Sequence, residues 1–215
     1  MTVDAVAGDE QLYPVNLRIA ATRCLVVGGG RVALAKVLGL LEAGASVTVL
    51  APQVEPAIVA LDVAVHRRRY ACGDVAGFRL AIAATGDPKV NQAVFDDGEA
   101  LGVWVNAADD PARCSFTLPA RVRRGSLLLT VATGGQSPAV ASWLRSRLED
   151  EIGPEYEVLL TLVAEARSEL RAKGVATEGL AWREALDSGM LELVREGNLI
   201  EAKERLQACL SSSSG

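Results

Sequence analysis

Residues 23–52, RCLVVGGGRVALAKVLGLLEAGASVTVLAP, decide the fold class of this chain. A short apolar run at 24–27 ends abruptly at three glycines, and the apolar residues between 32 and 41 then recur at helical spacing. Ala43-Gly44 suits the end of that helix, because glycine readily takes the left-handed conformation just beyond it. A second apolar run follows at 47–50. This order of strand, glycine turn, helix and strand predicts the opening of a dinucleotide-binding sheet.

The glycine turn has the residue types that a pyrophosphate site needs. Gly28 lets the chain turn sharply out of the strand, and Gly30 lets the backbone approach the phosphates without an intervening side chain. Ala33 is small enough for the helix to pack closely on the strand, and the first N–H groups of the helix attract an anion. A GxGxxA pattern alone is weak. Its place between a strand and a helix favours a dinucleotide site over an ordinary tight turn.

The second strand lacks a residue that such sites usually have. The acid that binds the ribose hydroxyls would fall near Leu50 or Ala51, and neither is acidic. No arginine is adjacent in the sequence either, so a 2′-phosphate has no evident partner. This position therefore does not distinguish NAD from NADP.

Composition excludes several classes of partner. The chain has 215 residues and a net charge of −5, with no basic stretch interleaved with aromatic residues, which argues against nucleic acid. The apolar runs are shorter than a membrane span and no N-terminal signal pattern is present, so we expect a cytoplasmic protein without a membrane anchor. Four cysteines without a CxxC pair and a single histidine, His66, predict neither disulfides nor a metal site. We expect His66 on an edge strand.

The remaining pattern predicts an α/β fold with a Rossmann-type parallel sheet in residues 1–112. Residues 113–150 then form a small α+β segment, and residues 151–215 form a helical domain with a disordered tail. Further strands are predicted at 63–70, 78–85, 103–107, 115–118 and 126–132, the last two separated by Pro119 and a basic cluster. Helices are predicted at 53–61, 90–100, 139–173 with a break at 153–154, 180–193 and 199–210.

Three groups of residues should meet at the carboxyl edge of the sheet, where ligands bind in open α/β folds. They are residues 28–31, 85–87 and 106–110. Asp109 and Asp110 directly follow a strand, which suits an acid or base, although a cap and a turn explain such a pair equally well.

Two later features fit either anion binding or a structural function. The arginines at 121, 123 and 124 suit bidentate contacts to an anionic substrate, or form a solvated hairpin tip. The turn at 133–138 opens a helix with Ser137 as a natural N-cap and Pro138 at the first helical position. It is a second anion site or simply a capping turn.

The chain carries three motif segments that together resemble precorrin-2 dehydrogenase. They are GGGxVAxxKxxxLLEAGAxVTVLAP, LAIAATGDPKVN and VNAADDPARCSFTLPARVRRGSLLLTVATGGQSPAVASWLR. This family oxidises precorrin-2 to sirohydrochlorin and forms the N-terminal half of siroheme synthase. The resemblance runs from about residue 13 to 148 and weakens in the helical tail. The methyltransferase half of the fused enzyme is not expected in this sequence.

The resemblance implies a homodimeric, NAD-dependent enzyme in which residues 113–150 form the dimer and Asp109 is catalytic. The residues that it implies for the cofactor are Gly28, Gly29, Gly30, Arg31, Val32, Ala51, Thr85, Asp87 and Asn106. Precorrin-2, the substrate that the resemblance implies, is a macrocycle with eight carboxylates. The residues implied for it are Asn106, Arg113, Arg121, Arg124, Thr133, Gly134 and Ser137.

Three other functions compete with this one. A short-chain dehydrogenase needs Tyr-x-x-x-Lys, and none of the three tyrosines is followed by lysine at that spacing. A non-catalytic nucleotide-sensing module explains the sheet but not the TGGxSP and RRG elements. A bifunctional enzyme that also inserts ferrous iron into sirohydrochlorin is not separable from a dehydrogenase by sequence.

Overall fold

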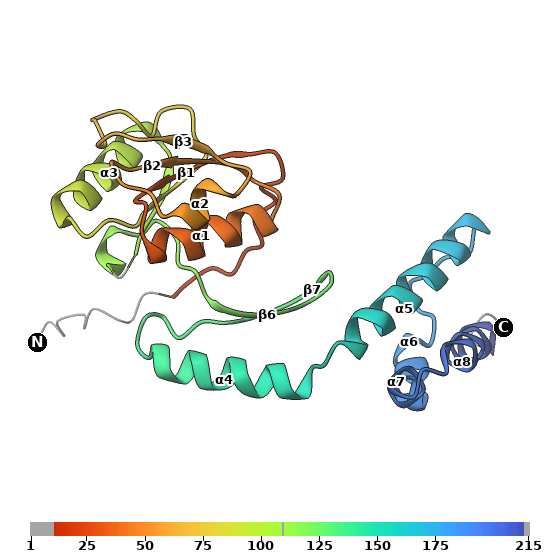
Figure 1. The fold of residues 1–215 in the computed structure, drawn as a ribbon. Helices are drawn as coiled ribbons and strands as arrows, with labels where there is room; N and C mark the ends of the chain where they lie inside the picture. The colour runs from red at the N-terminus through yellow and green to blue at the C-terminus, as the bar shows by residue number, and fades with distance from the viewer. Residues whose placement is uncertain (1–10, 109, 213–215) are drawn as a thin grey trace, which may run out of the picture. The chain divides into compact units, whose positions relative to one another are not determined.

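The computed structural model describes residues 11–108 and 110–212. The chain divides between Leu118 and Pro119 into two compact units, which are described one at a time (Figure 1). The use of residues 113–150 for dimerisation stays a prediction.

A five-stranded parallel sheet with the order β3-β2-β1-β4-β5 forms the centre of the first unit (Figure 1). Its strands are β1 (Arg23–Val27), β2 (Ser46–Leu50), β3 (Ala64–His66), β4 (Leu80–Ala83) and β5 (Trp104–Ala107). The helices between them are α1 (Arg31–Glu42), α2 (Pro56–Val59) and α3 (Pro88–Leu101), and the 3-10 turn η1 (Pro111–Arg113) follows β5. The predicted Rossmann-type sheet is confirmed.

Helices cover both faces of this sheet, which explains why its central strands are apolar throughout. Successive residues of a strand point to opposite faces, so each strand contributes to two cores. The core that includes α1 contains Cys24, Val26, Ala33, Val37, Val47 and Val49. The core that includes α3 contains Leu25, Val27, Ala81, Ala83, Val94 and Val105.

Two predicted elements of this unit are shorter in the structure. The strand predicted at 63–70 ends at His66. Two residues further on, Arg68 binds Asp74, with its nitrogens 2.5 and 2.9 Å from the two carboxylate oxygens. The helix predicted at 53–61 is only Pro56–Val59. His66 does lie on the edge strand, as predicted.

The second unit begins with an antiparallel hairpin that corrects the sequence-based prediction. The strand predicted at 115–118 is not formed, and the basic cluster that was to separate two strands is itself β6 (Ala120–Arg124), paired with β7 (Leu127–Val131). Arg124 pairs with Leu127, which leaves a two-residue turn whose first residue, Gly125, has a φ of +55°. A two-residue hairpin turn requires positive φ there, and glycine supplies it without strain.

Helices make up the rest of the second unit. They are α4 (Pro138–Glu151), α5 (Glu155–Ala172), α6 (Trp182–Ala185), the π-helical turn η2 (Leu186–Met190), α7 (Leu191–Arg195) and α8 (Leu199–Ser212). The break between α4 and α5 falls at Gly153-Pro154, as predicted. α6, η2 and α8 pack with α5 around Ala166, Ala185, Met190 and Leu206, and α7 places Leu193 and Val194 in a second cluster with Ala202.

Candidate functional site

A pocket of about 870 Å³ lies at the carboxyl edge of the parallel sheet, within the first unit. The strand order reverses between β1 and β4, and the crevice at such a reversal is where open α/β sheets bind ligands. Loops that follow all five strands supply its lining: Val27, Gly28, Gly29, Gly30, Arg31, Val32, Leu50, Ala51, Pro52, Gln53, Arg69, Tyr70, Ala84, Thr85, Gly86, Asp87, Val90 and Ala108. Its volume is in the usual range for small-molecule and cofactor sites, roughly 300–1,000 Å³.

The three glycines of the turn meet different surroundings. A Cβ at Gly28, whose φ is +130°, would lie 2.2 Å from the carbonyl oxygen of Ala84, and one at Gly29 would lie 2.0 Å from that of Gln53. A Cβ at Gly30 would meet no atom within 4 Å. The first two glycines therefore let neighbouring loops pack against the turn, and the third leaves open space. The packing function of Gly29 was not predicted, because it depends on a loop 24 residues further along the chain.

The start of α1 offers backbone donors to this open space. Gly30 is the N-cap and provides no side-chain cap, so N–H groups of the first helical turn keep their hydrogen-bonding capacity for a ligand. The helix dipole adds a partial positive charge there. Ala33 is fully buried against the sheet, as predicted. Open space above unpaired N–H groups fits the phosphates of a dinucleotide.

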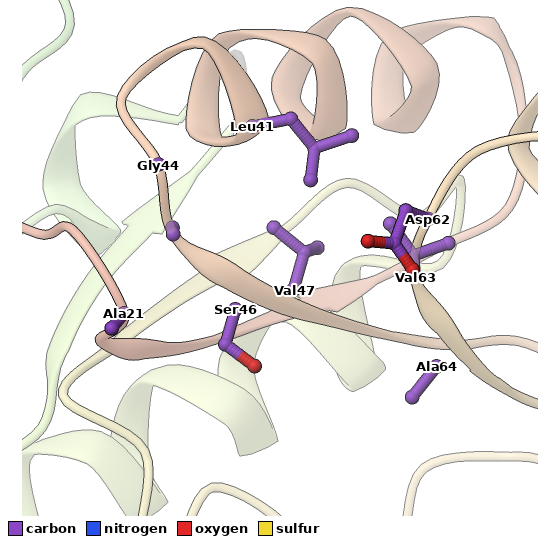
Figure 2. A pocket seen from close by; sticks show the side chains of 9 residues that line it. Ala21, Leu41, Gly44, Ser46, Val47, Asp62, Val63 and Ala64 are labelled. Carbon is purple, nitrogen blue, oxygen red and sulfur yellow. The ribbon is translucent and has the colours of Figure 1, made fainter.

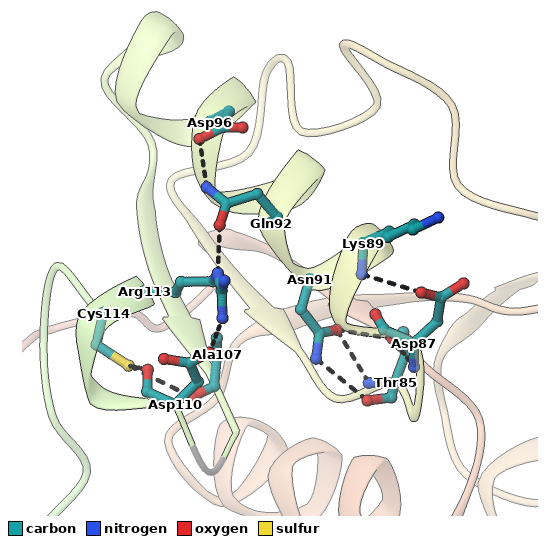
Figure 3. Close-up of polar contacts among 10 residues, drawn as sticks. All are labelled: Thr85, Asp87, Lys89, Asn91, Gln92, Asp96, Ala107, Asp110, Arg113 and Cys114. Atoms are coloured by element: carbon teal, nitrogen blue, oxygen red, sulfur yellow. Dashed lines mark hydrogen bonds and ion pairs between the residues drawn. The ribbon is translucent and has the colours of Figure 1, made fainter.

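The loop after β4 is held by hydrogen bonds between Thr85 and Asn91 (Figure 3). The Thr85 hydroxyl donates to Asn91 Oδ1 at 2.7 Å, and Asn91 Nδ2 donates to the Thr85 carbonyl at 3.2 Å. Asp87 Oδ1 accepts the Lys89 N–H at 2.9 Å and so caps α3. Sequence reasoning missed Asn91. The sequence showed only a polar residue in the first turn of a helix next to the site, and the structure adds that Asn91 is buried.

The residues after β5 form a separate network (Figure 3). The Arg113 guanidinium donates to Gln92 and pairs with the Asp110 carboxylate, which ties Asp110 to the η1 turn. The buried Asn106 donates to the carbonyl of Phe116 at 2.9 Å. Neither Asn106 nor Arg113 lines the pocket. Asp109, the predicted catalytic residue, lies outside the described residues.

The loop after β3 brings an unpredicted tyrosine and arginine to the pocket. The Tyr70 hydroxyl donates to Asp97 of α3 at 2.5 Å, and the Gly73 N–H donates to the same carboxylate at 2.7 Å. Burial, and then the hydrogen bond to Asp97, raises the pKa of Tyr70 above its ordinary value. The same hydrogen bond, followed by that from Gly73, holds the pKa of Asp97 below its ordinary value. In the sequence, Arg69 therefore lies between Tyr70, which binds Asp97, and Arg68, which binds Asp74.

No acid follows β2 in the lining of the pocket, and an arginine distant in the sequence lines the same pocket. Ala51, Pro52 and Gln53 line the pocket there, and none carries a charge. Sequence reasoning found no arginine beside this position, yet the structure places Arg69 in the lining of the same pocket. The two residues are 18 positions apart in the sequence, and only the pairing of β2 with β3 brings their loops together.

The other predicted substrate residues belong to the second unit. Arg124 donates from Nε to the carbonyl of Ile152 at 2.7 Å and from Nη2 to that of Glu149 at 3.0 Å, so it stabilises the carboxyl end of α4. Arg121 lies in β6. Neither arginine is at a hairpin tip, because the turn is formed by residues 125 and 126.

The Thr133 turn has the geometry of a helix cap. The N–H of Ser137 donates to the Thr133 hydroxyl at 3.3 Å, and the Ser137 hydroxyl accepts the N–H of Val140 at 3.2 Å. Gly134 has a φ of +59°, which glycine takes without strain. The predicted N-cap and the proline at the first helical position are confirmed.

Figure 2 shows a second, smaller hollow of about 350 Å³ in the first unit. Ser46 and Ala64, the first residues of β2 and β3, lie in its lining with Ala21 and Gly44. It is therefore at the amino ends of the strands, opposite the edge where the glycine turn lies.

The described part of the chain contains neither a helix suited to a membrane nor a clustered metal site. None of the helices there is both long and apolar enough for a bilayer crossing. No group of three or more histidine, cysteine or carboxylate side chains is arranged to hold a metal ion among the residues that the structure describes.

Comparison with known proteins identifies relatives of both units. Residues 15–120 match the family described as "Putative NAD(P)-binding". Siroheme synthase of Chromobacterium violaceum is 36% identical over 203 residues, which are 92% of this chain and 43% of that protein. Siroheme synthase of Stutzerimonas stutzeri is 39% identical over 204 residues, 92% of this chain and 44% of that protein. The chain thus spans less than half the length of these relatives.

A solved structure matches nearly the whole chain. SirC, precorrin-2 dehydrogenase, superposes with a TM-score of 0.75 and 27% sequence identity, covering 92% of this chain and 98% of that one. The resemblance predicted from the three motif segments is therefore confirmed, and it extends into the helical tail.

Proposed function

From an NAD(P)-binding domain at residues 15–120 and relatives among siroheme synthases and precorrin-2 dehydrogenase, we propose that this chain oxidises precorrin-2 to sirohydrochlorin with NAD as electron acceptor. The observation that carries the proposal is the pocket at the carboxyl edge of the sheet. Its open wall at Gly30 and the uncapped start of α1 fit a pyrophosphate. Predicted cofactor residues Gly28 to Val32, Ala51, Thr85 and Asp87 all line it.

Oxidation of the reduced tetrapyrrole removes a hydride and a proton. NAD, when bound, accepts the hydride. We assign the proton to Asp109 as general base. In support, Asp109 directly follows Ala108 in the sequence, and Ala108 lines the pocket. Its neighbour Asp110 is paired with Arg113.

Substrate carboxylates need cationic or hydrogen-bonding partners. Two of the predicted substrate arginines already have partners within the protein. Arg113 and Arg124 are engaged within the protein, so binding a carboxylate with them requires an exchange of partners. Arg31 lines the pocket at the start of α1. We propose that Arg121, which the resemblance also implies for the substrate, binds a carboxylate of the macrocycle. We also keep the predicted substrate contacts at the turn that opens α4, which contains Thr133, Gly134 and Ser137.

We also propose that the protein is a homodimer formed through the hairpin and α4. All fourteen residues of α4 are described, and none is buried. Trp143 is 56% exposed and Val140 45% exposed. A sheet of only two strands is marginally stable alone, so a second copy that covers this hairpin and helix would stabilise both.

Anaerobic incubation of the whole chain with precorrin-2 and NAD tests the proposal. We expect the absorbance of sirohydrochlorin to appear together with NADH, in equal amounts. Repeating the reaction with ferrous or cobaltous ion tests the bifunctional alternative, because metal insertion would then consume the sirohydrochlorin. Dinucleotide binding without any turnover would overturn the proposal and support a nucleotide-sensing module.

A further inference from the structure

Arg69 lies next to the place where dinucleotide sites usually carry an acid. β3 pairs with β2 in a register that aligns Leu50 with His66, and the Ala51 N–H donates to the His66 carbonyl at 3.1 Å. The loops after these two strands therefore leave the sheet side by side. Arg69 and Ala51 both line the pocket. In this fold the residue after β2 faces the adenosine ribose.

The part of the lining that Ala51 and Arg69 form differs in charge from that of an NAD-selective site. A carboxylate after β2 binds the ribose hydroxyls and repels a 2′-phosphate, whereas a nearby arginine accommodates that phosphate. Here the position of the acid is taken by the uncharged residues 51–53. Asp87 is the one acid among the residues that the structure places in the lining, and it caps α3 in the loop after β4. Nothing described in the pocket beside Arg69 neutralises its charge.

The loop that carries Arg69 is anchored on both sides. Arg68 makes two contacts to Asp74, at 2.5 and 2.9 Å, and Tyr70 donates to Asp97 at 2.5 Å. The Arg69 guanidinium itself has no hydrogen-bond or ion-pair partner among the described residues. A phosphate that binds there therefore breaks no existing ion pair, and the loop needs little ordering to receive it.

We infer that Arg69 binds the 2′-phosphate of a phosphorylated dinucleotide, so that the pocket takes NADP at least as tightly as NAD. The inference rests on the proposed dinucleotide function of the pocket and adds its selectivity. It assigns Arg69 as the residue that determines selectivity, with the Tyr70–Asp97 hydrogen bond as its anchor.

Calorimetric titration of the whole chain with NAD and with NADP tests this at a fixed, low salt concentration. The variants are Arg69→Ala and, as a charge-matched control, Arg67→Ala, since Arg67 is exposed and does not line the pocket. We expect wild-type Kd values for NADP no higher than those for NAD. Arg69→Ala should weaken NADP binding by about tenfold or more, the usual effect of losing hydrogen bonds between charged groups, and NAD binding by less than about threefold. Arg67→Ala should change neither by more than about twofold.

Different outcomes separate this inference from the proposed function. Binding of NAD with a Kd for NADP clearly higher than that for NAD overturns the inference alone. Equal loss of NADP affinity in the two arginine variants also overturns it, because the effect is then one of net charge. If the wild type binds neither dinucleotide, the proposed function fails and the inference fails with it.

Discussion

Replacing Gly30 with aspartate should separate cofactor binding from folding. The backbone at Gly30 has φ −93° and ψ −168°, which any residue adopts, and a Cβ there would meet no atom within 4 Å. Aspartate is also a better N-cap than glycine, because its carboxylate accepts N–H groups of the first helical turn. We therefore expect the free energy of unfolding to stay the same or to rise by a few tenths of a kcal/mol.

The effect on binding has the opposite sign. The added carboxylate occupies the donors that the pyrophosphate needs and places a like charge beside it. Two unit charges about 4 Å apart repel each other by about 4 kcal/mol at an effective dielectric constant of about 20. Salt screens part of this repulsion, so we expect NAD affinity to fall by at least about 100-fold, equivalent to about 2.7 kcal/mol.

Gly30→Asn is the matched control, since asparagine caps a helix as well as aspartate and adds similar volume without charge. Calorimetry with NAD and urea unfolding would be measured on both variants. The expected order of NAD affinity is wild type, then Gly30→Asn, then Gly30→Asp. If the aspartate variant binds NAD as tightly as the asparagine variant, the phosphates do not lie at the start of α1, and the pocket assignment is wrong.

Three further results are expected. Asp109→Asn should lower precorrin-2 turnover about 100-fold or more with little change in NAD affinity, while Asp110→Asn costs much less; equal turnover in the two variants would remove Asp109 from catalysis. Tyr70→Phe should lower the free energy of unfolding by about 1.5 kcal/mol at pH 7. Because the folded-state pKa of Asp97 is lowered and that of Tyr70 is raised, this stabilisation is present between about pH 4 and pH 10, and it is lost as the pH falls through the folded-state pKa of Asp97 or rises through that of Tyr70. If urea unfolding gives the same difference in free energy of unfolding between the wild type and Tyr70→Phe at pH 7 and at pH 2, the hydrogen bond to ionised Asp97 is not its source. Wild-type protein should sediment as a dimer at micromolar concentration and Trp143→Glu mainly as a monomer; a wild-type monomer argues against the proposed interface.

Local patterns in the sequence were sufficient for the elements whose signals lie within a few residues of each other. The apolar run before Gly28 and the helical spacing after Gly30 predicted β1 and α1, because a strand and a helix impose periods of two and 3.6 residues on their own side chains. The cap at Ser137 and its following proline were likewise readable, since both act within a single helical turn. The alternative that Thr133 belongs to a capping turn was also available from sequence.

Contacts between residues far apart in the sequence determined the features that these local patterns do not encode. The arginines of β6 do not resemble a strand in the sequence, because their charge hides a period-two pattern in which only Val122 is buried. The carbonyl partners of Arg124 lie 25 and 28 residues further along the chain. Arg69 reaches the pocket only because β3 pairs beside β2. Sequence determines which side chains one element presents, but hydrogen bonding between strands and packing between loops determine which distant charges become neighbours. For this protein, those neighbours include the residue that we infer selects its cofactor.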